Sequence, residues 1–413
     1  MTPPSPISAP SPWRVANVVA QIGYGLLAMT ICLPSMPEWS RAFDASPAAV
    51  QLTFSAYVLS YGTLQLVHGP WSDRQGRRRV LMIGLALAAA GAVLAALATR
   101  IDALIAARAL QGAGAAAGMV AGRAIVQDLF TGAQRTRVMA YVGMAMGLIP
   151  PTATIVGGQM HVHLGWQAAF VAMALLAAAL LVAAWRGLPD DRPPPGASAR
   201  ARGGARALAG AYATLLGHRG FVLHVAVLSF TVAAFYAFLS GAPLVLAHLG
   251  VGPASVGFYI MTVPLSYIAG NFTCSRLVQR RGEPWLMRAG QALTLSGIVA
   301  MLALGVAGAR HPLAFSLPLM LLGMGHGLLM PPTLARTVGA VGALAGSAAA
   351  VAGVMQQLIG ALGAYAVGWV PHESQVNLAL VMLSFTLVAQ AALASLARRP
   401  GGLSASPPSP HRP

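Results

Sequence analysis

Ionisable side chains are scarce in this sequence of 413 residues. Only 8% of the residues are charged, lysine is absent, and nine acidic residues stand against 26 arginines, which gives a formal net charge of +17. Hydrophobic residues make up 57% of the chain, well above the share in soluble domains. A nucleic-acid-binding protein would collect its arginines on one soluble face. The composition therefore argues against a soluble protein and indicates a membrane protein.

The sequence also lacks the motifs that other membrane protein classes require. It has no nucleotide-binding loop of the G-x-x-x-x-G-K-[ST] type for direct use of ATP, and no His-Glu-x-x-His motif or cysteine cluster for a metal. The two cysteines, Cys32 and Cys274, are expected at opposite membrane faces, which excludes a disulfide. No Ser-His-acid set lies at membrane depth, and no long soluble segment suits a sensor. We therefore expect no cofactor, no metal and no enzymatic activity.

Long apolar segments fill most of the chain. A bilayer core of about 30 Å needs roughly 20 apolar residues per helix, and about twelve segments meet that need. They lie near 15–36, 48–69, 80–99, 103–125, 136–160, 166–186, 220–246, 254–276, 285–308, 312–335, 341–369 and 376–397. We predict an all-α integral membrane protein with two six-helix bundles. Its parts are a tail at 1–14, a bundle at 15–186, a linker at 187–218, a bundle at 219–397 and a tail at 398–413.

The loop arginines predict the orientation of the chain. If the N-terminus lies in the cytoplasm, most of them fall on the cytoplasmic side, and only Arg41, Arg100 and Arg310 fall outside. This asymmetry follows the positive-inside rule, so both termini and the linker are expected in the cytoplasm. The first span lacks a basic n-region and a cleavage site, and we expect it to be retained.

The densest charge lies in the loop after the second segment, where the spacing is G-x-x-x-D-R-x-G-R-R. Arg77 in this loop can bridge Asp73 and Asp128, at the end of the fourth segment. Membrane anchoring alone would explain the arginines but not the ordered glycines and acid, so we favour a conformational latch. Its expected residues are Gly69, Asp73, Arg74, Gly76, Arg77, Arg78 and Asp128. The second half carries a degenerate copy, which runs from Gly270 through Arg280-Arg281-Gly282 and lacks the acid.

Further motifs occupy the first, fourth, fifth and eleventh segments, at 33–37, 104–114, 123–128, 147–158 and 345–356. Together with the charged loop they resemble the major facilitator superfamily, and within it the bicyclomycin-resistance (Bcr/CflA) branch of drug:proton antiporters. The resemblance implies a monomeric secondary transporter of a bacterial inner membrane that works by alternating access, with the latch closed in the outward-open state. It also implies an antiporter bend in the fifth helix, at Pro150, Pro151, Gly157 and Gly158.

The chain departs from the family pattern at one charged position. Thr30 stands where the family has an aspartate, and all nine acidic residues fall in loops or near helix ends. Arg108 lies inside the fourth span with Gln111 on the same helical face, and it is either a functional charge or a structural arginine held by carbonyls of helix 1. We expect it to be the only permanent charge in the cavity, where a cation would find no counter-ion. Neutral or anionic substrates are therefore expected.

Histidine is the remaining titratable group for proton coupling. His326 lies in the middle of a span, between Gly325 and Gly327, and glycines there are expected to loosen the helix. It is either a proton carrier or a neutral histidine bonded to a carbonyl, and both alternatives remain open.

Polar and aromatic residues at helical spacing mark the expected walls of a substrate cavity, although each alone also suits a bond between helices. They are Asn17, Gln21, Tyr24, Thr30, His224, Thr231, Phe235, Tyr236, Tyr267, Asn271, Gln356 and Gln357. The predicted function is efflux of small amphiphiles by antiport with protons, carried out by a protein that contacts the lipid bilayer and no nucleic acid. The alternative is a proton-independent facilitator of an anionic or neutral metabolite.

Overall fold

A computed structural model describes residues 11–189, 213–340 and 345–398, and this part is built from helices. The first elements in chain order are α1 (Pro12–Thr30), η1 (Leu33–Ser35), α2 (Met36–Ala42), α3 (Pro47–Gln75), α4 (Arg77–Ala96), α5 (Ile101–Leu129), α6 (Gly132–Leu164) and α7 (Gln167–Gly187). The remaining elements are α9 (Arg219–His248), α10 (Pro253–Ile260), α11 (Thr262–Arg281), α12 (Glu283–Val306), α13 (Pro312–Ser316), α14 (Leu319–Gly339), α15 (Ala345–Val367) and α16 (Gln375–Ala397).

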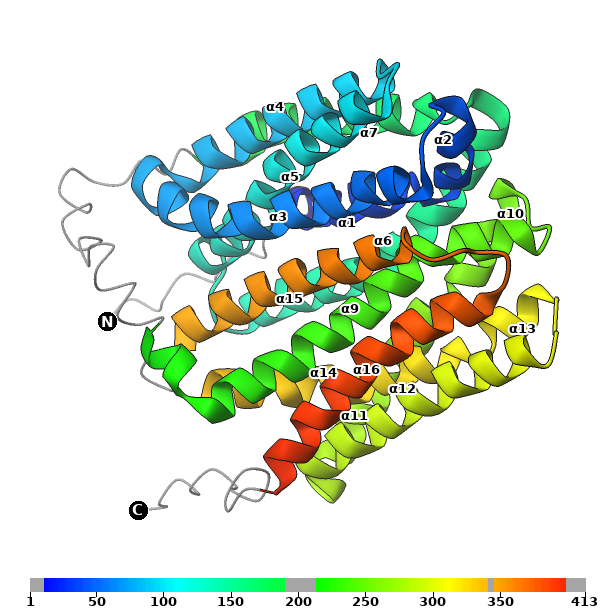
Figure 1. The fold of residues 1–413 in the computed structure, drawn as a ribbon. Helices are drawn as coiled ribbons and strands as arrows, with labels where there is room; N and C mark the ends of the chain where they lie inside the picture. The colour runs from blue at the N-terminus through cyan, green and yellow to red at the C-terminus, as the bar shows by residue number, and fades with distance from the viewer. Residues whose placement is uncertain (1–10, 190–212, 341–344, 399–413) are drawn as a thin grey trace, which may run out of the picture.

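The helices pack as two bundles, the N-terminal half with α1 to α7 and the C-terminal half with α9 to α16 (Figure 1). Ten helical stretches of the described chain are long and apolar enough to cross a membrane. Helices α3 and α11 run beside them but carry more polar side chains. The predicted all-α membrane fold is confirmed. The predicted linker and both predicted tails lie mostly outside the described residues.

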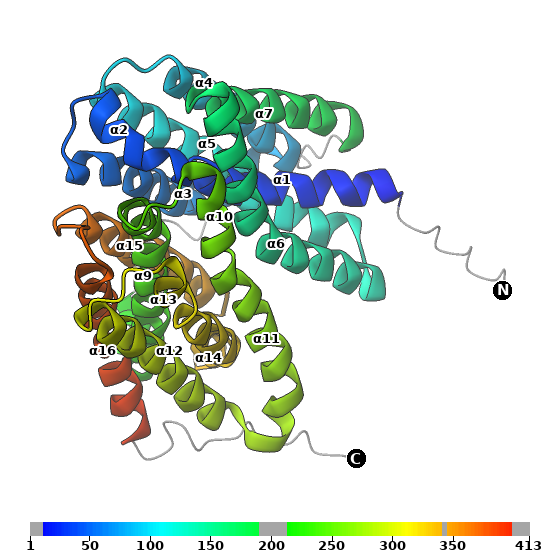
Figure 2. The ribbon, with the colours of Figure 1, turned by 90° about the vertical axis from the view of Figure 1, so that its right-hand side faces the viewer.

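The bundle has two unlike ends. The arginine-rich end holds the turns at Gly76 and Gly282, and the α2 end holds α2, α10 and α13. The two halves meet at the α2 end, and they diverge toward the arginine-rich end, where α6 and α11 point away from each other (Figure 2). The backbones of the two halves are therefore in contact at the α2 end, whereas α6 and α11 separate toward the arginine-rich end.

Small residues bring neighbouring helices close together within each half. A Cβ atom built on Gly84 of α4 would lie 2.7 Å from the carbonyl oxygen of Gly114 on α5, and one on Gly91 would lie 2.5 Å from the backbone nitrogen of Gln111. Only glycine permits such an approach. In lipid, where apolar side chains gain little by leaving the solvent, such contacts supply much of the packing.

Prolines divide three segments that the sequence predicts as single helices. Pro34 lies in the short η1 element that separates α1 from α2, Pro264 lies in the first turn of α11, and Pro318 precedes α14. Proline has no backbone N–H and crowds the preceding turn, so the helix breaks or restarts beside it. The predicted segments at 15–36, 254–276 and 312–335 are each interrupted for this reason.

Candidate functional site

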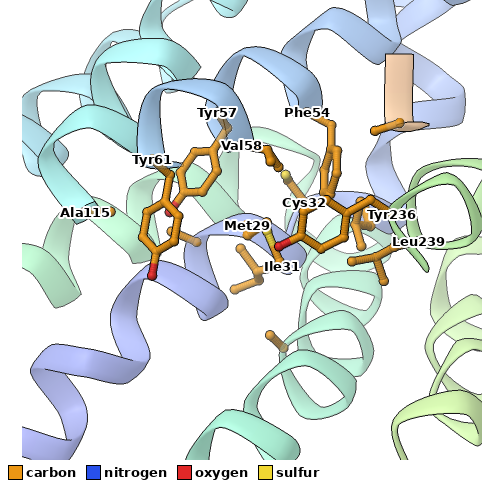
Figure 3. Packing of buried hydrophobic residues seen from close by; sticks show 14 of the residues in the cluster. Met29, Ile31, Cys32, Phe54, Tyr57, Val58, Tyr61, Ala115, Tyr236 and Leu239 are labelled. Carbon is orange, nitrogen blue, oxygen red and sulfur yellow. The ribbon is translucent and has the colours of Figure 1, made fainter. Parts of the chain in front are cut away.

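The halves touch along a seam that is closed near its middle by aromatic and amide side chains. The ring centroids of Phe54 (α3) and Tyr236 (α9) are 6.0 Å apart, and the Tyr236 hydroxyl donates a 2.9 Å hydrogen bond to Oε1 of Gln357 (α15). Gly62 of α3 lies directly against the Gln357 side chain. Figure 3 shows Cys32 beside Phe54, with Tyr236 approaching from the other half. Tyr236 and Gln357, both predicted cavity residues, therefore lie where the halves meet.

Glycine also closes the seam at the α2 end, where α6 crosses α10. A Cβ atom on Gly158 would lie 3.4 Å from Cα of Ala254, and one on Gly257 would lie 2.7 Å from Cα of Ile155. Nε2 of Gln159 donates to the Ala254 carbonyl at 3.3 Å. Two backbones are thus in direct contact across the halves.

The rest of the predicted antiporter bend lies within the N-terminal half. Pro150 and Pro151 are inside α6, which continues as one helix from Gly132 to Leu164. Gly157 is packed against the backbone of Ile31, which follows α1. The two adjacent glycines therefore contact different halves, Gly157 the N-terminal half and Gly158 the C-terminal half.

Three of the predicted polar residues of α1 hold this helix to α7. Nδ2 of Asn17 donates to the Ala183 carbonyl at 2.8 Å, and Nε2 of Gln21 donates to the Leu180 carbonyl at 2.9 Å. The Tyr24 hydroxyl is 3.3 Å from the Met173 carbonyl oxygen, and the Thr30 hydroxyl donates to Leu26 of its own helix. These contacts are those of helix packing.

Arg108 is enclosed within the N-terminal half, with 1% of its surface exposed. Its Nη1 donates to the Ala28 carbonyl at 2.9 Å and to Oε1 of Gln111 at 2.5 Å. The guanidinium carbon lies 4.2 Å from the centroid of the Tyr57 ring, a cation–π geometry, while Nη2 is buried without a hydrogen-bond partner in the described chain. The prediction that Arg108 is the permanent charge of the cavity is therefore wrong, because rings and carbonyls of its own half surround it.

His326 of α14 faces α9, where its ring lies 6.3 Å from that of Phe235. Its Nε2 is buried and has no hydrogen-bond partner among the described residues. The flanking glycines do not loosen the helix: a Cβ on Gly325 would lie 2.7 Å from Thr294 N of α12, and one on Gly327 would lie 2.7 Å from Asn271 N of α11. They let α14 pack closely between two neighbours and turn His326 toward α9.

The other predicted cavity residues make contacts within the C-terminal half. Asn271 donates to the Tyr267 carbonyl one turn earlier, and Nε2 of Gln356 donates to the Ala352 carbonyl. His224 bonds to the Gly220 carbonyl at 2.8 Å, and the Thr231 hydroxyl is buried. The hydrogen bonds of His224, Asn271 and Gln356 stay within their own helices and do not link them to Tyr236 or Gln357.

The charged loop forms the predicted bridge. Arg77, the first residue of α4 after Gly76 at φ 95°, forms ion pairs with Asp73 and Asp128, the latter at 3.5 Å, and donates to the Ser72 hydroxyl at 2.9 Å. Arg78 donates to the Trp185 carbonyl, Gly69 lies near Val120, and Arg74 is exposed. These contacts join α3, α4, α5 and α7 at the arginine-rich end.

The second half holds a counterpart with the charges exchanged. Glu283 is the first residue of α12 after Gly282 at φ 75°, and its Oε2 lies 2.8 Å from Nε of Arg336 near the end of α14. In the first half the arginine is the first residue of its helix, α4, and Asp128 comes from α5. In the second half the acid is the first residue of α12, and the arginine comes from α14. The sequence reasoning missed this pair, although Glu283 directly follows the Arg-Arg-Gly run.

A pocket of about 610 Å³ lies between the halves at the α2 end. Its polar lining comes from the N-terminal half, where Nε2 of His161 is 2.8 Å from Glu38 and Nδ1 is 3.0 Å from the Ser35 hydroxyl. Arg41 completes the polar lining, and the C-terminal half contributes apolar residues. His161 was not among the site residues predicted from the sequence.

His372, in the loop between α15 and α16, is buried at the same end. Burial lowers the pKa of His372 from 6.5 to about 4; the charge of nearby His248 acts in the same direction, and a hydrogen bond with the Val367 backbone opposes it. The unfolded chain therefore binds this proton at a higher pH than the folded chain does. Stability contributed by neutral His372 is present above pH 6.5 and is lost as the pH falls toward about 4.

We therefore expect His372→Gln to flatten the pH dependence of thermal stability. The melting temperature of the purified wild type should fall more than that of the variant when the pH is lowered from neutral to about 5. His163→Gln, at an exposed position, serves as the control. Parallel pH profiles for the wild type and His372→Gln would contradict the assignment.

Arg123, which was not among the predicted site residues, lies nearly two turns inside α5, and its side chain is exposed. Its Nη2 lies 3.7 Å from the sulfur of Met146 on α6. Phe54 and Tyr61, aromatic residues of the predicted second segment, were also overlooked. Their spacing of seven residues places both on one face of α3, which was the signal available.

Comparison with known proteins agrees with this geometry. Residues 20–364 match the family model described as Major Facilitator Superfamily. The chain is 26% identical over 367 residues to "Multidrug resistance protein D" of Escherichia coli (strain K12), which covers 88% of this chain and 91% of that protein. It is 27% identical over 325 residues to a "Chloramphenicol resistance protein" of Pseudomonas aeruginosa, with 76% and 75% covered.

Solved structures give the same fold. The crystal structure of a bacterial homolog of the human lysosomal transporter Spinster superposes with a TM-score of 0.73 at 14% identity, over 93% of this chain and 96% of that chain. The family match spans most of the sequence, and the two-bundle architecture is shared. The chain therefore belongs to the Major Facilitator Superfamily of membrane transporters.

Proposed function

We propose that this transporter exports small drug-like amphiphiles across a bacterial inner membrane by alternating access, as a monomer of the Bcr/CflA branch with both termini in the cytoplasm. The observation that carries the proposal is the asymmetry of the seam, which is closed at the α2 end and opens toward the arginine-rich end. With the arginines in the cytoplasm, this conformation faces inward and takes up substrate from inside. The multidrug and chloramphenicol resistance named for two relatives supports export.

The two ion-pair networks at the arginine-rich end fit a role in the opposite, outward-facing conformation. Arg77 with Asp73 and Asp128, and Arg336 with Glu283, each fasten the start of one helix to the end of another. Fastened helix ends give each half a rigid surface that can dock against the other when this end closes. These ion pairs lie within one half each and are already formed in this inward-facing conformation, so we assign them this docking role in place of the expected latch that closes only in the outward-open state.

Proton coupling is the finer part of the proposal, and His326 is the residue that we assign to it. The acidic residues of the described chain lie at helix ends or in loops, so no carboxylate takes this role at membrane depth. His326 is buried within the C-terminal half, beside the Phe235 ring and one residue from the tight contact at Gly325. A change in its protonation would act directly on the packing of α9 against α14.

The proposal is tested by proton movement in proteoliposomes when a neutral phenicol is added. We expect the wild type and the exposed-site control His163→Gln to exchange protons for substrate, and His326→Gln to lose the exchange. A cationic dye should be carried poorly, because no carboxylate would pair with it.

Two results would change the assignment. Substrate movement without proton movement in the wild type would make the protein a facilitator of neutral or anionic metabolites. Strong transport of the cationic dye would contradict the charge preference.

A further inference from the structure

Unbalanced positive charge collects at the turn between α11 and α12. Four exposed arginines lie there, namely Arg276, Arg280, Arg281 and Arg288. The acid of this turn, Glu283, is paired with Arg336 at 2.8 Å, and none of the four arginines forms an ion pair among the described residues. Together with the aromatic residues Phe272 and Trp285, the four arginines form the α11–α12 strip.

The strip is continuous across the turn. Three of its members follow one another at intervals of four residues along one side of α11, namely Phe272, Arg276 and Arg280. The guanidinium carbon of Arg281 lies 5.4 Å from the centroid of the Trp285 ring, which joins the end of α11 to the start of α12. Arg288 follows Trp285 by three residues and so lies on the same side of α12.

On α11 the strip faces away from the interior of the C-terminal half. The face that packs on α14 carries Gly270, where a Cβ atom would lie 3.1 Å from the Met324 carbonyl carbon, and the buried Cys274. Phe272 and Arg276 each follow these residues by two positions, a rotation of about 200° around the helix. They therefore project from the side of α11 that is opposite to α14.

Exposed aromatic rings hold two of the arginines. The guanidinium carbon of Arg276 lies 4.3 Å from the centroid of the Phe272 ring, and Arg281 lies over Trp285. Phe272 is 58% exposed and Trp285 is 38% exposed. An aromatic face attracts a guanidinium without accepting its N–H groups in the plane, so these groups can still donate to an acceptor outside the chain.

The depth of these residues suits the boundary between the apolar core of a bilayer and its headgroups. At a rise of about 1.5 Å per residue, Arg276 lies roughly 8 Å from the end of α11 at Arg281, and Phe272 lies roughly 14 Å from it. A long arginine side chain extends from such a position to the headgroups, and tryptophan is typical of this boundary. The strip thus places charges at headgroup depth and a ring at the depth of the acyl chains.

The corresponding turn of the first half uses its arginines within the protein. Arg77 pairs with Asp73 and Asp128, and Arg78 donates to the Trp185 carbonyl. The positive-inside rule accounts for arginines on one side of a membrane, but it does not require them to lie over exposed rings. The turn between α11 and α12 is therefore the one built to receive an anion from outside the chain.

We propose that the α11–α12 strip binds the phosphate group of an anionic phospholipid. Guanidinium groups donate paired, charge-assisted hydrogen bonds to phosphate oxygens, and the two rings pack against the glycerol backbone and the acyl chains. Because Ile268 of α11 lies against Gly147 of α6, the lipid would contact a helix that borders the other half. The inference rests on the proposed function for the leaflet that supplies the lipid, but its test measures binding alone.

The test titrates the purified full-length protein with phosphatidylglycerol, or with phosphatidylcholine of the same acyl chains, and measures lipid binding by native mass spectrometry. Each arginine near an anionic headgroup contributes roughly fivefold to affinity, so the double variant Arg276→Gln with Arg281→Gln should bind phosphatidylglycerol roughly 30-fold more weakly. Its binding of phosphatidylcholine should change by no more than about twofold. The double lysine variant keeps both charges and should retain most of the affinity, and Phe272→Leu should lower it by about two- to fivefold.

Arg79→Gln with Arg137→Gln is the matched control, because it removes two exposed arginines from the same end of the N-terminal half. Its affinity for phosphatidylglycerol should stay within about twofold of the wild type. An equal loss in both double variants would show a general attraction to positive charge, and unchanged binding in Arg276→Gln with Arg281→Gln would show that the lipid binds elsewhere. Either result would overturn the proposal.

A competition experiment distinguishes a lipid from a soluble phosphate. Millimolar glycerol phosphate shares the headgroup chemistry but lacks acyl chains, so it should lower phosphatidylglycerol binding by no more than about twofold. Strong displacement would identify a site for soluble phosphates and overturn the lipid assignment. Transport in proteoliposomes is measured separately, so selective lipid binding without substrate export would leave the strip intact and contradict the proposed function.

Discussion

Gly158→Leu is expected to abolish net transport while the protein remains folded. A Cβ atom at this position would lie 3.1 Å from the Pro253 carbonyl carbon and 3.4 Å from Cα of Ala254, and backbone atoms of α10 cannot rotate away. Overpacking of this kind costs about 1–3 kcal/mol, which shifts a two-state equilibrium by roughly 5- to 150-fold. Because the contact joins the two halves, the cost falls on closure of the α2 end and not on the fold of either half.

The native cysteines make the shift measurable. Cys32 is 1% exposed and lies beside Phe54 at the seam, so separation of the halves at the α2 end would uncover it. In a Cys274→Ser background Cys32 is the sole thiol. We expect its reaction with a maleimide, followed in nanodiscs, to accelerate by at least about fivefold in Gly158→Leu.

Gly143→Leu is the control for this substitution. It lies on the same helix, and a Cβ there would meet nothing within 4 Å, so transport and Cys32 reactivity should stay close to the wild type. Loss of transport in Gly158→Leu without faster labelling of Cys32 would show that the glycine acts in some other way than by permitting closure.

The sequence is enough to predict the helices of this protein because the bilayer imposes a strong requirement on length and hydrophobicity. The errors concern continuity. Proline at positions 34, 264 and 318 divides segments whose hydrophobicity is uninterrupted, and hydropathy does not register the loss of one backbone donor.

It is harder to predict which neighbour each face of a helix meets than to predict the helix itself. Asn17, Gln21 and Tyr24 do share one face of α1, as their spacing requires, but that face meets α7 and not the other half. Periodicity shows that residues lie together and leaves open which neighbour they meet. The same limit applies to Arg108, which points into its own bundle.

Charge patterns were easier to recognise than to pair. The loop from Gly69 to Arg78 has a recognisable spacing, and its partner Asp128 lies at the end of the fourth predicted segment, on the same side of the membrane. The Glu283–Arg336 pair spans 53 residues and exchanges the signs, so comparison of the two halves by residue type could not find it. Both pairs follow a glycine at positive φ that starts a helix, and this shared backbone geometry is the repeated feature.

Arg108→Met is expected to separate stability from function. Burial of a charge costs desolvation free energy, and no carboxylate compensates that cost at Arg108 in the described chain. The guanidinium makes two hydrogen bonds and lies over the Tyr57 ring. Its Nη2 has no hydrogen-bond partner among the described residues. Replacement of buried ionic groups by apolar residues of similar volume is often neutral or stabilising by about 1–4 kcal/mol. We therefore expect the melting temperature of Arg108→Met to match or exceed that of the wild type.

Transport should fall by at least about tenfold in the same variant, since a charge kept at membrane depth against a cost in stability marks a function. The guanidinium lies over the Tyr57 ring of α3 and holds α1 at the Ala28 carbonyl, so it ties two helices together beside the seam. Arg108→Lys retains the charge and should keep part of the activity. A melting temperature lowered in Arg108→Met in step with transport would instead show that Arg108 stabilises the N-terminal half, and the charge would then have no separate role in transport.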